Sequence, residues 1–330
     1  MKILVRLPNW LGDVVMSTAF LRTLRSVWPE AAIDVIIKKG LDSLADLVPG
    51  INRHYVFDRD EWKGLKGAYR FGKKIKKETR YDMFFCLPDS FSSAVMGWAS
   101  GAKKRIGFKK ELRSFLLTHS FTKPTPLHRA EEYVFLLRKF IKQDIPVPGV
   151  KLEPRAPLIP GQVILNFNSE AISRRMPVHK AVTVLNALVN QIPGAGFVCI
   201  GSKKDRDHIG NILTQSGLSE RVINKAGMTP GLPDLIALIG SGAVMLSTDS
   251  GPAHIANALG VPLVVLFGAG NENNTAPFNK ENRVILRLGQ LPCEPCVKNT
   301  CIYGLPKCLE LLDEQLIVKA VQGFLGYTSV

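Results

Sequence analysis

Three polar loops of this sequence each follow a predicted apolar strand and precede a predicted helix. They span residues 8–13, 168–177 and 247–254. In open parallel α/β sheets, ligands bind outside the carboxyl ends of the strands, where such loops lie. We therefore expect the residues that do chemistry to belong to these three loops.

Asp13 ends the first loop and begins a predicted helix. Its carboxylate can accept a proton from a substrate hydroxyl, as a general base does, and the neighbouring Gly12 lets the backbone approach a ligand closely. The alternative interpretation is that Asp13 only caps the helix. In either case, the helix dipole is expected to lower the pKa of this carboxyl, which weakens it as a base.

The second loop contains Arg174 and Arg175, just before a predicted helix that starts near Pro177. Two guanidinium groups beside the positive end of a helix make a suitable clamp for a phosphate. A solvated pair of charges would have the same sequence, so this alternative stays open.

The third loop reads Ser-Thr-Asp-Ser-Gly-Pro-Ala-His from residue 247 to residue 254. Ser250 and Gly251 offer backbone N–H groups to an anion, and Asp249 can bind the hydroxyl groups of a sugar. His254 lies one turn into the following helix. The alternative is a capped turn followed by a histidine whose hydrogen bonds are satisfied in the core.

Four cysteines form a C-x2-C-x4-C-x6-C pattern, namely Cys293, Cys296, Cys301 and Cys308. Four thiolates suit tetrahedral zinc, although this spacing differs from the commonest zinc-finger patterns. Reduced structural thiols and local disulfides are the alternatives. Because the chain has six cysteines and no recognisable export signal, we expect it to work in a reducing cytoplasm.

The elements that must position these loops alternate between strands and helices. The predicted strands are residues 2–7, 33–37, 55–58, 83–87, 163–167, 197–201, 244–247 and 263–267. The predicted helices are residues 13–27, 61–79, 90–99, 129–143, 178–191, 205–216, 232–240, 253–259 and 313–325. Apolar strands separated by helices are typical of a parallel sheet covered on both faces. Two such series predict two doubly wound α/β domains, as does the length of 330 residues.

A proline-rich segment separates the two series. Residues 145–161 contain five prolines and two glycines, and proline stops helices and stiffens linkers. We therefore expect one domain at residues 1–155 and a second at residues 156–330.

Several protein classes are excluded by missing signals. The sequence has no G-x-x-x-x-G-K-[ST], G-x-G-x-x-G, H-E-x-x-H or G-x-S-x-G motif. This argues against a P-loop nucleotide hydrolase, a dehydrogenase, a zinc protease and a serine hydrolase. No apolar stretch approaches the ~20 residues that span a bilayer.

The net charge of +15 is concentrated in the first half of the chain. Residues 1–160 contain 29 Lys and Arg against 16 Asp and Glu, whereas the remaining residues contain 14 against 12. Many basic residues lie on or near the predicted helix 61–79 and in the segment 103–113, with aromatic residues among them. Such a face favours an anionic lipid surface or an acidic substrate. A solvated charge run is the alternative, and no nucleic-acid partner is expected because no nucleic-acid-binding module is visible.

Taken together, the three loops resemble one family. The patterns P-x-W-x-G-D at residues 8–13, R-R-x-P at residues 174–177 and T-D-S-G-P-A-H-I-A-N-A-L-G at residues 248–260 are similar to motifs of glycosyltransferase family 9, the ADP-heptose:lipopolysaccharide heptosyltransferases. Further motifs of this family resemble three short segments, LPDSFSSA at residues 87–94, RIGF at residues 105–108 and NKAGMT at residues 224–229. The cysteine pattern resembles that of the heptosyltransferase II branch of the family. The resemblance covers essentially the whole chain.

The resemblance implies a GT-B fold, in which two Rossmann-like domains face each other across a cleft. The first domain would bind the acceptor and the second the donor ADP-heptose, and the final helix of such enzymes often crosses back to the first domain. It also implies an inverting, direct displacement that requires no metal and no cofactor. The expected reaction adds L-glycero-D-manno-heptose to the first heptose of the lipopolysaccharide inner core, on lipid A that carries Kdo.

The resemblance also implies roles for individual residues. Asp13 matches the family's proposed general base. The implied donor-binding residues are Arg174, Arg175, Asp205, Thr229, Asp249, Ser250, Gly251 and His254. The implied acceptor-binding residues are Asn9, Trp10, Gly12, Ser90, Arg105 and Arg113. The family's usual K-R-W-P reads R-R-M-P in this chain, which changes the expected phosphate clamp.

The expected setting is a monomer in the cytoplasm, bound peripherally to the anionic inner face of the inner membrane. Two other enzyme interpretations are heptosyltransferase I and another family 9 transferase with a different acceptor. A third, from a different class, is a non-catalytic basic module that binds anionic lipid.

Overall fold

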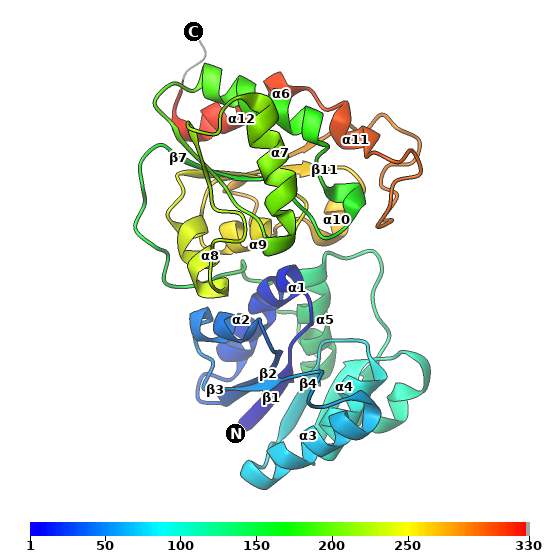
Figure 1. Ribbon diagram of the computed structural model, residues 1–330. Helices are drawn as coiled ribbons and strands as arrows, with labels where there is room; N and C mark the ends of the chain where they lie inside the picture. The colour runs from blue at the N-terminus through cyan, green and yellow to red at the C-terminus, as the bar shows by residue number, and fades with distance from the viewer. Residues whose placement is uncertain (328–330) are drawn as a thin grey trace. The chain divides into compact units, whose positions relative to one another are not determined.

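The computed structural model describes residues 1–327, apart from the side chain of Glu111. The chain divides into two compact units, Met1–Glu153 and Pro154–Val330 (Figure 1). The division falls two residues before the predicted boundary and inside the same proline-rich segment. Each unit is an α/β fold with its own sheet and its own core.

The first unit is built on six parallel strands in the order β3-β2-β1-β4-β5-β6. They are β1 (Lys2–Arg6), β2 (Ala32–Lys38), β3 (Arg53–Phe57), β4 (Met83–Cys86), β5 (Lys104–Phe108) and β6 (His119–Phe121). The central strands are almost wholly buried: β1 is covered at four of its five residues and β4 at all four. Burial on both faces explains why these strands appear in the sequence as continuous apolar runs.

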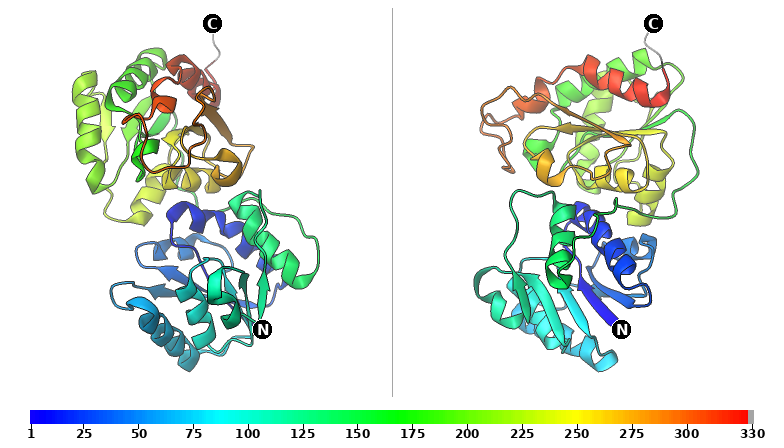
Figure 2. Two further views of the ribbon diagram at one scale, coloured as in Figure 1. Left: turned by 90° about the vertical axis from the view of Figure 1, so that its right-hand side faces the viewer. Right: turned by 180° about the vertical axis from the view of Figure 1, so that it is seen from behind.

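Helices cover both faces of this first sheet (Figures 1 and 2). They are α1 (Leu11–Met16), α2 (Thr18–Val27), α3 (Gly64–Glu78), α4 (Phe91–Ala99) and α5 (Arg129–Ile141), with short 3-10 helices η1 (Asp42–Leu47) and η2 (Glu111–Leu116). Helix α2 packs beside α5, and α3 packs closely beside α4. The close approach of α3 to α4 requires Gly72, because a Cβ atom there would lie 2.5 Å from the Met96 carbonyl oxygen.

The second unit repeats this architecture, with the sheet order β12-β11-β10-β7-β8-β9. Its strands are β7 (Gln162–Asn166), β8 (Gly196–Cys199), β9 (Val222–Asn224), β10 (Val244–Thr248), β11 (Leu263–Phe267) and β12 (Arg283–Arg287). Its helices are η3 (Ile172–Arg174), α6 (Val178–Gln191), η4 (Lys203–Asp205), α7 (Arg206–Ser216), α8 (Leu232–Gly240), α9 (Gly251–Ala258), α10 (Glu272–Thr275), α11 (Lys307–Glu310) and α12 (Glu314–Leu325). If strands are counted within each unit, both sheets have the order 3-2-1-4-5-6.

This strand order has one functional consequence. It reverses direction between β1 and β4 in the first sheet, and between β7 and β10 in the second. At such a switch point the connections leave in opposite directions, so that a crevice opens beyond the carboxyl ends of the two strands. The loops after β1 and β4, and those after β7 and β10, are therefore the expected places for ligands.

Some expectations about the elements need correction. Strands β5, β6, β9 and β12 were not predicted, because they are short or carry polar and charged residues. The predicted helix 13–27 is two helices that meet at Ser17. The final helix α12 packs against α6 and the strands β10–β12, and buries Ile317, Val318 and Val321 in the core of the second unit. It therefore belongs to the second unit, whereas the resemblance suggested that it crosses back to the first.

Candidate active-site residues

Asp13 lies at the switch point of the first sheet, in the first turn of α1. The N-cap of this helix is Trp10, so the interpretation of Asp13 as a mere cap is wrong. The Asp13 carboxylate instead faces α5, where the Nε atom of Arg129 lies 3.8 Å from Oδ1. The carboxylate is a quarter exposed and thus remains accessible to a substrate.

The pKa of Asp13 differs from the sequence-based expectation. Burial raises the pKa of this carboxyl above its usual value, and nearby Glu132 adds to the rise, whereas Arg129 and Lys123 oppose it. The expected lowering by the helix dipole does not prevail, because desolvation penalises the charged form more strongly. A raised pKa makes Asp13 a stronger base than a solvated aspartate.

The rest of the first loop is shaped by a buried arginine. Arg6 is 2% exposed and donates hydrogen bonds to the Leu7 carbonyl oxygen and to Asn9 Oδ1. Asn9 therefore holds the loop in place through Arg6. Trp10, in contrast, is 63% exposed, and its ring is available to a ligand. Gly12 lies in the first turn of α1.

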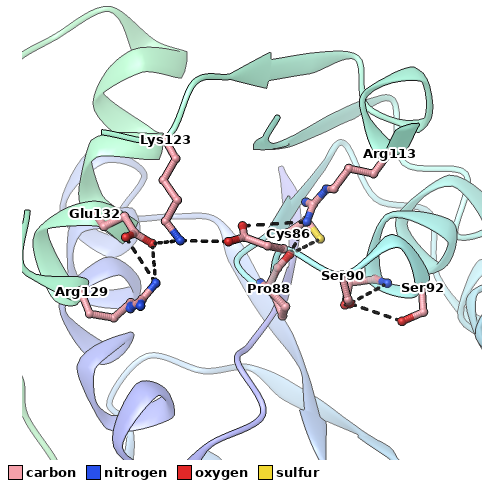
Figure 3. Close-up of polar contacts among 10 residues, drawn as sticks. Cys86, Pro88, Ser90, Ser92, Arg113, Lys123, Arg129 and Glu132 are labelled. Carbon is pink, nitrogen blue, oxygen red and sulfur yellow. Dashed lines mark hydrogen bonds and ion pairs between the residues drawn. The ribbon is translucent and has the colours of Figure 1, made fainter. Parts of the chain in front are cut away.

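The loop after β4 supplies the other side of this switch point. Ser90 is the N-cap of α4 and accepts a hydrogen bond from the Ser93 backbone N–H at 3.3 Å. Arg113 is fully buried, and its Nη1 atom donates to the Pro88 carbonyl oxygen at 2.6 Å (Figure 3). Arg113 thus supports the loop that carries Ser90.

Arg105 is not brought together with these residues. It lies near the amino end of β5, whereas the loops of the site follow the carboxyl ends of the strands. Its guanidinium donates to the carbonyl oxygens of Leu116 (2.8 Å) and Ala102 (2.9 Å), which braces the backbone. Nothing in this geometry supports the expected acceptor-binding role of Arg105.

The second unit joins four of the predicted donor-binding residues in two ion pairs, beyond the carboxyl ends of β7, β8 and β10. Arg174 Nη1 lies 3.1 Å from Asp249 Oδ2, and Arg175 Nη2 lies 2.8 Å from Asp205 Oδ1. Asp205 also accepts hydrogen bonds from the Ser202 backbone N–H and hydroxyl. The alternative of solvated arginine charges is thus wrong, because each arginine is paired with a carboxylate.

Asp249 is the most enclosed of these groups, at 4% exposure. Burial raises the pKa of its carboxyl, and the positive charges of Arg174 and Arg287 oppose the rise. The loop after β11 closes over this carboxylate: a Cβ atom on Gly270 would lie 2.0 Å from Asp249 Oδ2. Only glycine at this position lets the backbone approach Asp249 so closely.

The beginning of α9 completes the group. Ser250 is the N-cap, and its hydroxyl accepts a hydrogen bond from Asn166 Nδ2 at 2.8 Å. Gly251 opens the helix, and His254 lies one turn into it, as the sequence predicts. The His254 side chain is buried. Thr229 lies in the loop that follows β9, at the same edge of the sheet.

The cysteines are not assembled into a cluster. All six are free thiols, and within residues 1–327 no three His, Cys, Asp or Glu side chains are grouped so that they could hold a metal ion. The zinc and disulfide alternatives for the C-terminal four therefore lack support. Burial raises the pKa of the Cys308 thiol to about 11, which keeps it protonated. Cys86 and Cys199 are buried in strands, as expected.

Sequence reasoning missed the charged neighbours of Asp13, namely Lys123, Arg129 and Glu132, and the contact between Lys123 and Asp89. Arg129 begins a helix that the sequence does predict. Neither its spacing from Asp13 nor that of Lys123 carries a signal, because both are more than a hundred residues away along the chain.

The fold and the two groups of residues define a class of protein. Two Rossmann-like units in series, each with charged residues at its switch point, are the architecture of the GT-B glycosyltransferases. The sequence profile of glycosyltransferase family 9 (heptosyltransferase) matches residues 68–158 and 184–306, and the chain belongs to this family.

Individual relatives agree with this assignment. Lipopolysaccharide heptosyltransferase 2 of Escherichia coli strain K12 is 29% identical over 315 residues, covering 86% of this chain and 88% of the relative. The solved structure of the E. coli ADP-heptose lipopolysaccharide heptosyltransferase II has a TM-score of 0.82 at 24% identity, with 98% of each chain covered. A family 9 glycosyltransferase from Veillonella parvula has a TM-score of 0.85 at 20% identity, covering 99% of this chain and 98% of its own.

Proposed function

We propose that this protein is a heptosyltransferase that moves L-glycero-D-manno-heptose from ADP-heptose onto the first heptose of the lipopolysaccharide inner core. The observation that carries the proposal is the pair of charged groups: a partly buried base, Asp13, in one unit and paired arginines in the other. The similarity to heptosyltransferase 2 relatives supports the choice of donor and acceptor.

In this mechanism Asp13 takes the proton from the acceptor hydroxyl. The freed oxygen attacks the anomeric carbon as the bond to ADP breaks on the opposite face, which inverts the configuration. The negative charge that develops on the β-phosphate is stabilised by Arg174, Arg175 and the N-terminus of α9, and such fixed charges and dipoles lower the barrier. Guanidinium groups and helix dipoles perform this stabilisation without a metal ion or cofactor.

The two carboxylates that pair with the arginines also have a role in this proposal. Asp249 and Asp205 hold the guanidinium groups in place before the donor arrives. Their remaining oxygen lone pairs can accept hydrogen bonds from donor hydroxyls. Guanidinium groups that are fixed in this way need little rearrangement during the reaction.

We further propose that the basic face of α3 binds the anionic inner face of the inner membrane, where the acceptor is anchored. Aromatic side chains lie among its charges: Arg70 stacks over Trp62, and Lys73 over Tyr69. Large apolar side chains are exposed on adjacent elements, at Trp98, Leu112 and Phe115. Among the described residues, no helix is both long and apolar enough to cross a bilayer.

The test is an ADP-release assay with two acceptors, one with lipid A that carries only Kdo and one that also carries the first heptose. Turnover restricted to the heptosylated acceptor is the expected result. Turnover with the Kdo-only acceptor would instead indicate heptosyltransferase I activity. No turnover with either, in a folded protein, would contradict the proposal and favour another acceptor or a non-catalytic lipid-binding role.

A further inference from the structure

Six charged side chains form a chain of alternating sign that begins at Asp13. In order of contact, they are Asp13, Arg129, Glu132, Lys123, Asp89 and Arg113. Figure 3 shows the part of this series from Arg129 to Arg113. Arg129 Nη1 donates to both oxygens of Glu132, at 3.0 and 3.3 Å, and Lys123 Nζ lies 2.8 Å from Glu132 and 2.9 Å from Asp89. This series of charged contacts thus connects the loop after β1 to the loop after β4 through α5.

Glu132, on the first turn of α5, lies at the centre of this series of charges. The residue is 3% exposed, yet it accepts from two different cations, so its negative charge is compensated on both sides. Removing charges from water is costly, and well-packed apolar residues often do as well for stability. Glu132 and Arg113 are buried and the other four are about a quarter exposed, so a series of charges this enclosed that ends on a reactive carboxylate calls for an explanation beyond stability.

The contact between Arg129 and Asp13 has an unusual geometry. At 3.8 Å it is long enough to be an electrostatic attraction without a hydrogen bond. The Arg129 Nε atom is buried and makes no hydrogen bond within the described part of the chain. An aspartate held in this way keeps its oxygen lone pairs available for an incoming proton, whereas a bidentate pair would occupy them.

We propose that Arg129, held in place by Glu132, is a positioning residue that orients the Asp13 carboxylate toward the acceptor hydroxyl. This inference rests on the proposed role of Asp13 as the general base. Lys123 and Asp89 extend the same support to the loop that carries Ser90. The charged or titratable groups around Asp13 are Arg129, Glu132 and Tyr133 on α5, together with Lys123 from the segment before it.

The test is the pH dependence of kcat for Arg129→Gln and Glu132→Gln, with Lys139→Gln as the matched control. Lys139 is an exposed cation on the same helix, ten residues from Arg129 and about 15 Å away along the axis. Asp13 must be unprotonated to act, so kcat falls as the pH drops below its pKa. Loss of the Arg129 charge removes an influence that lowers the pKa of Asp13, so the fall of kcat at low pH shifts to higher pH. Loss of the Glu132 charge shifts it to lower pH.

Shifts in opposite directions are the expected signature, together with an about tenfold or larger loss of maximal kcat for Arg129→Gln and partial recovery in Arg129→Lys. Lys139→Gln keeps the wild-type profile. Parallel profiles, in which both variants lose activity equally at every pH, would overturn the inference, and so would unchanged activity. Circular dichroism and the Kd for ADP verify that each variant is folded.

One further variant separates this inference from the proposed function. If Asp13→Asn transfers heptose at the wild-type rate, the proposed base is wrong, and the inference fails with it. If Asp13→Asn is inactive but the low-pH fall of kcat in Arg129→Gln and Glu132→Gln occurs at the wild-type pH, only the positioning role of Arg129 is wrong.

Discussion

At the scale of single residues, the environment of Asp13 decides what this carboxylate can do. Its position in the sequence predicts a carboxylate with a lowered pKa, because it lies at a helix N-terminus. Its surroundings reverse that prediction, because burial raises the pKa of Asp13 more than Arg129 lowers it. The dipole acts on any residue in a first turn, whereas desolvation depends on what the fold places around it.

We predict that Asp13→Ala lowers kcat by about a thousandfold, the usual contribution of a general base. The Kd for ADP stays within about twofold of wild type, because the residues proposed to bind the donor belong to the other unit. Single-turnover transfer and isothermal titration with ADP measure the two quantities. An unchanged rate would remove Asp13 from the mechanism.

A second prediction concerns Gly270. A Cβ atom at this position would lie 2.0 Å from Asp249 Oδ2, so Gly270→Ala must displace the carboxylate that holds Arg174. Because such overpacking costs about 1–3 kcal/mol, we expect the KM for ADP-heptose to rise about tenfold. Gly210→Ala is the matched control: no atom lies within 4 Å of its Cβ position, and helix α7 tolerates alanine. Equal KM values for the two variants would contradict the prediction.

At the scale of elements, helix α3 has one apolar, buried face and one basic face. Ala68, Phe71 and Ile75 recur at helical spacing and pack into the core of the first unit. The remaining face carries lysines and arginines, some of which, including Lys73, Lys76 and Lys77, line a surface hollow at the end of the helix. An element whose outer face is so basic is suited to an anionic surface.

We therefore predict that changing Lys73, Lys76 and Lys77 together to Gln weakens binding to vesicles that contain phosphatidylglycerol. Each basic residue contributes about 1 kcal/mol near such a surface, so the partition coefficient should fall about a hundredfold. Co-sedimentation at low salt measures it, with Lys319→Gln on α12 as a control for charge loss elsewhere. Vesicle binding that is equal in the variant and insensitive to salt would show that α3 is not the lipid-binding face.

At the scale of the whole molecule, the same strand order occurs twice, yet the two units differ in charge and in their switch-point residues. The first places a single proposed base beside charges of both signs, and the second pairs two arginines with two carboxylates. This difference suggests a division of labour, in which the first unit binds the acceptor and the second binds the donor.

Hydrogen exchange can test this division. We predict that ADP alone slows amide exchange in residues 168–177 and 247–254, whereas the acceptor alone slows it in residues 8–13 and 87–94. Ligand contacts suppress the local openings through which amides exchange. Protection by ADP centred on the first unit would contradict the assignment of donor and acceptor.

Some helices of this fold follow from local sequence patterns, whereas its edge strands do not. Helices α6 (Val178–Gln191) and α8 (Leu232–Gly240) have the predicted bounds, because each has a clear apolar periodicity and a proline at its start. Strands β6 and β12 escaped prediction, since β6 has three partly exposed residues and β12 carries an arginine at each end. Edge strands bury one side less completely, so their sequences lack the apolar run that identifies a central strand.

What the sequence alone determined is the class of fold, the two units and the loops that carry Asp13, Arg174 and Asp249. These features depend on local patterns, namely apolar runs, turn residues and motifs, which are contiguous along the chain. Only the tertiary structure decided which side chains meet: that Arg129 faces Asp13, that each arginine of the second unit has its own carboxylate, and that Arg105 lies at the opposite edge of its sheet. Such contacts join residues far apart in sequence, and their geometry is set by packing, which no local pattern encodes.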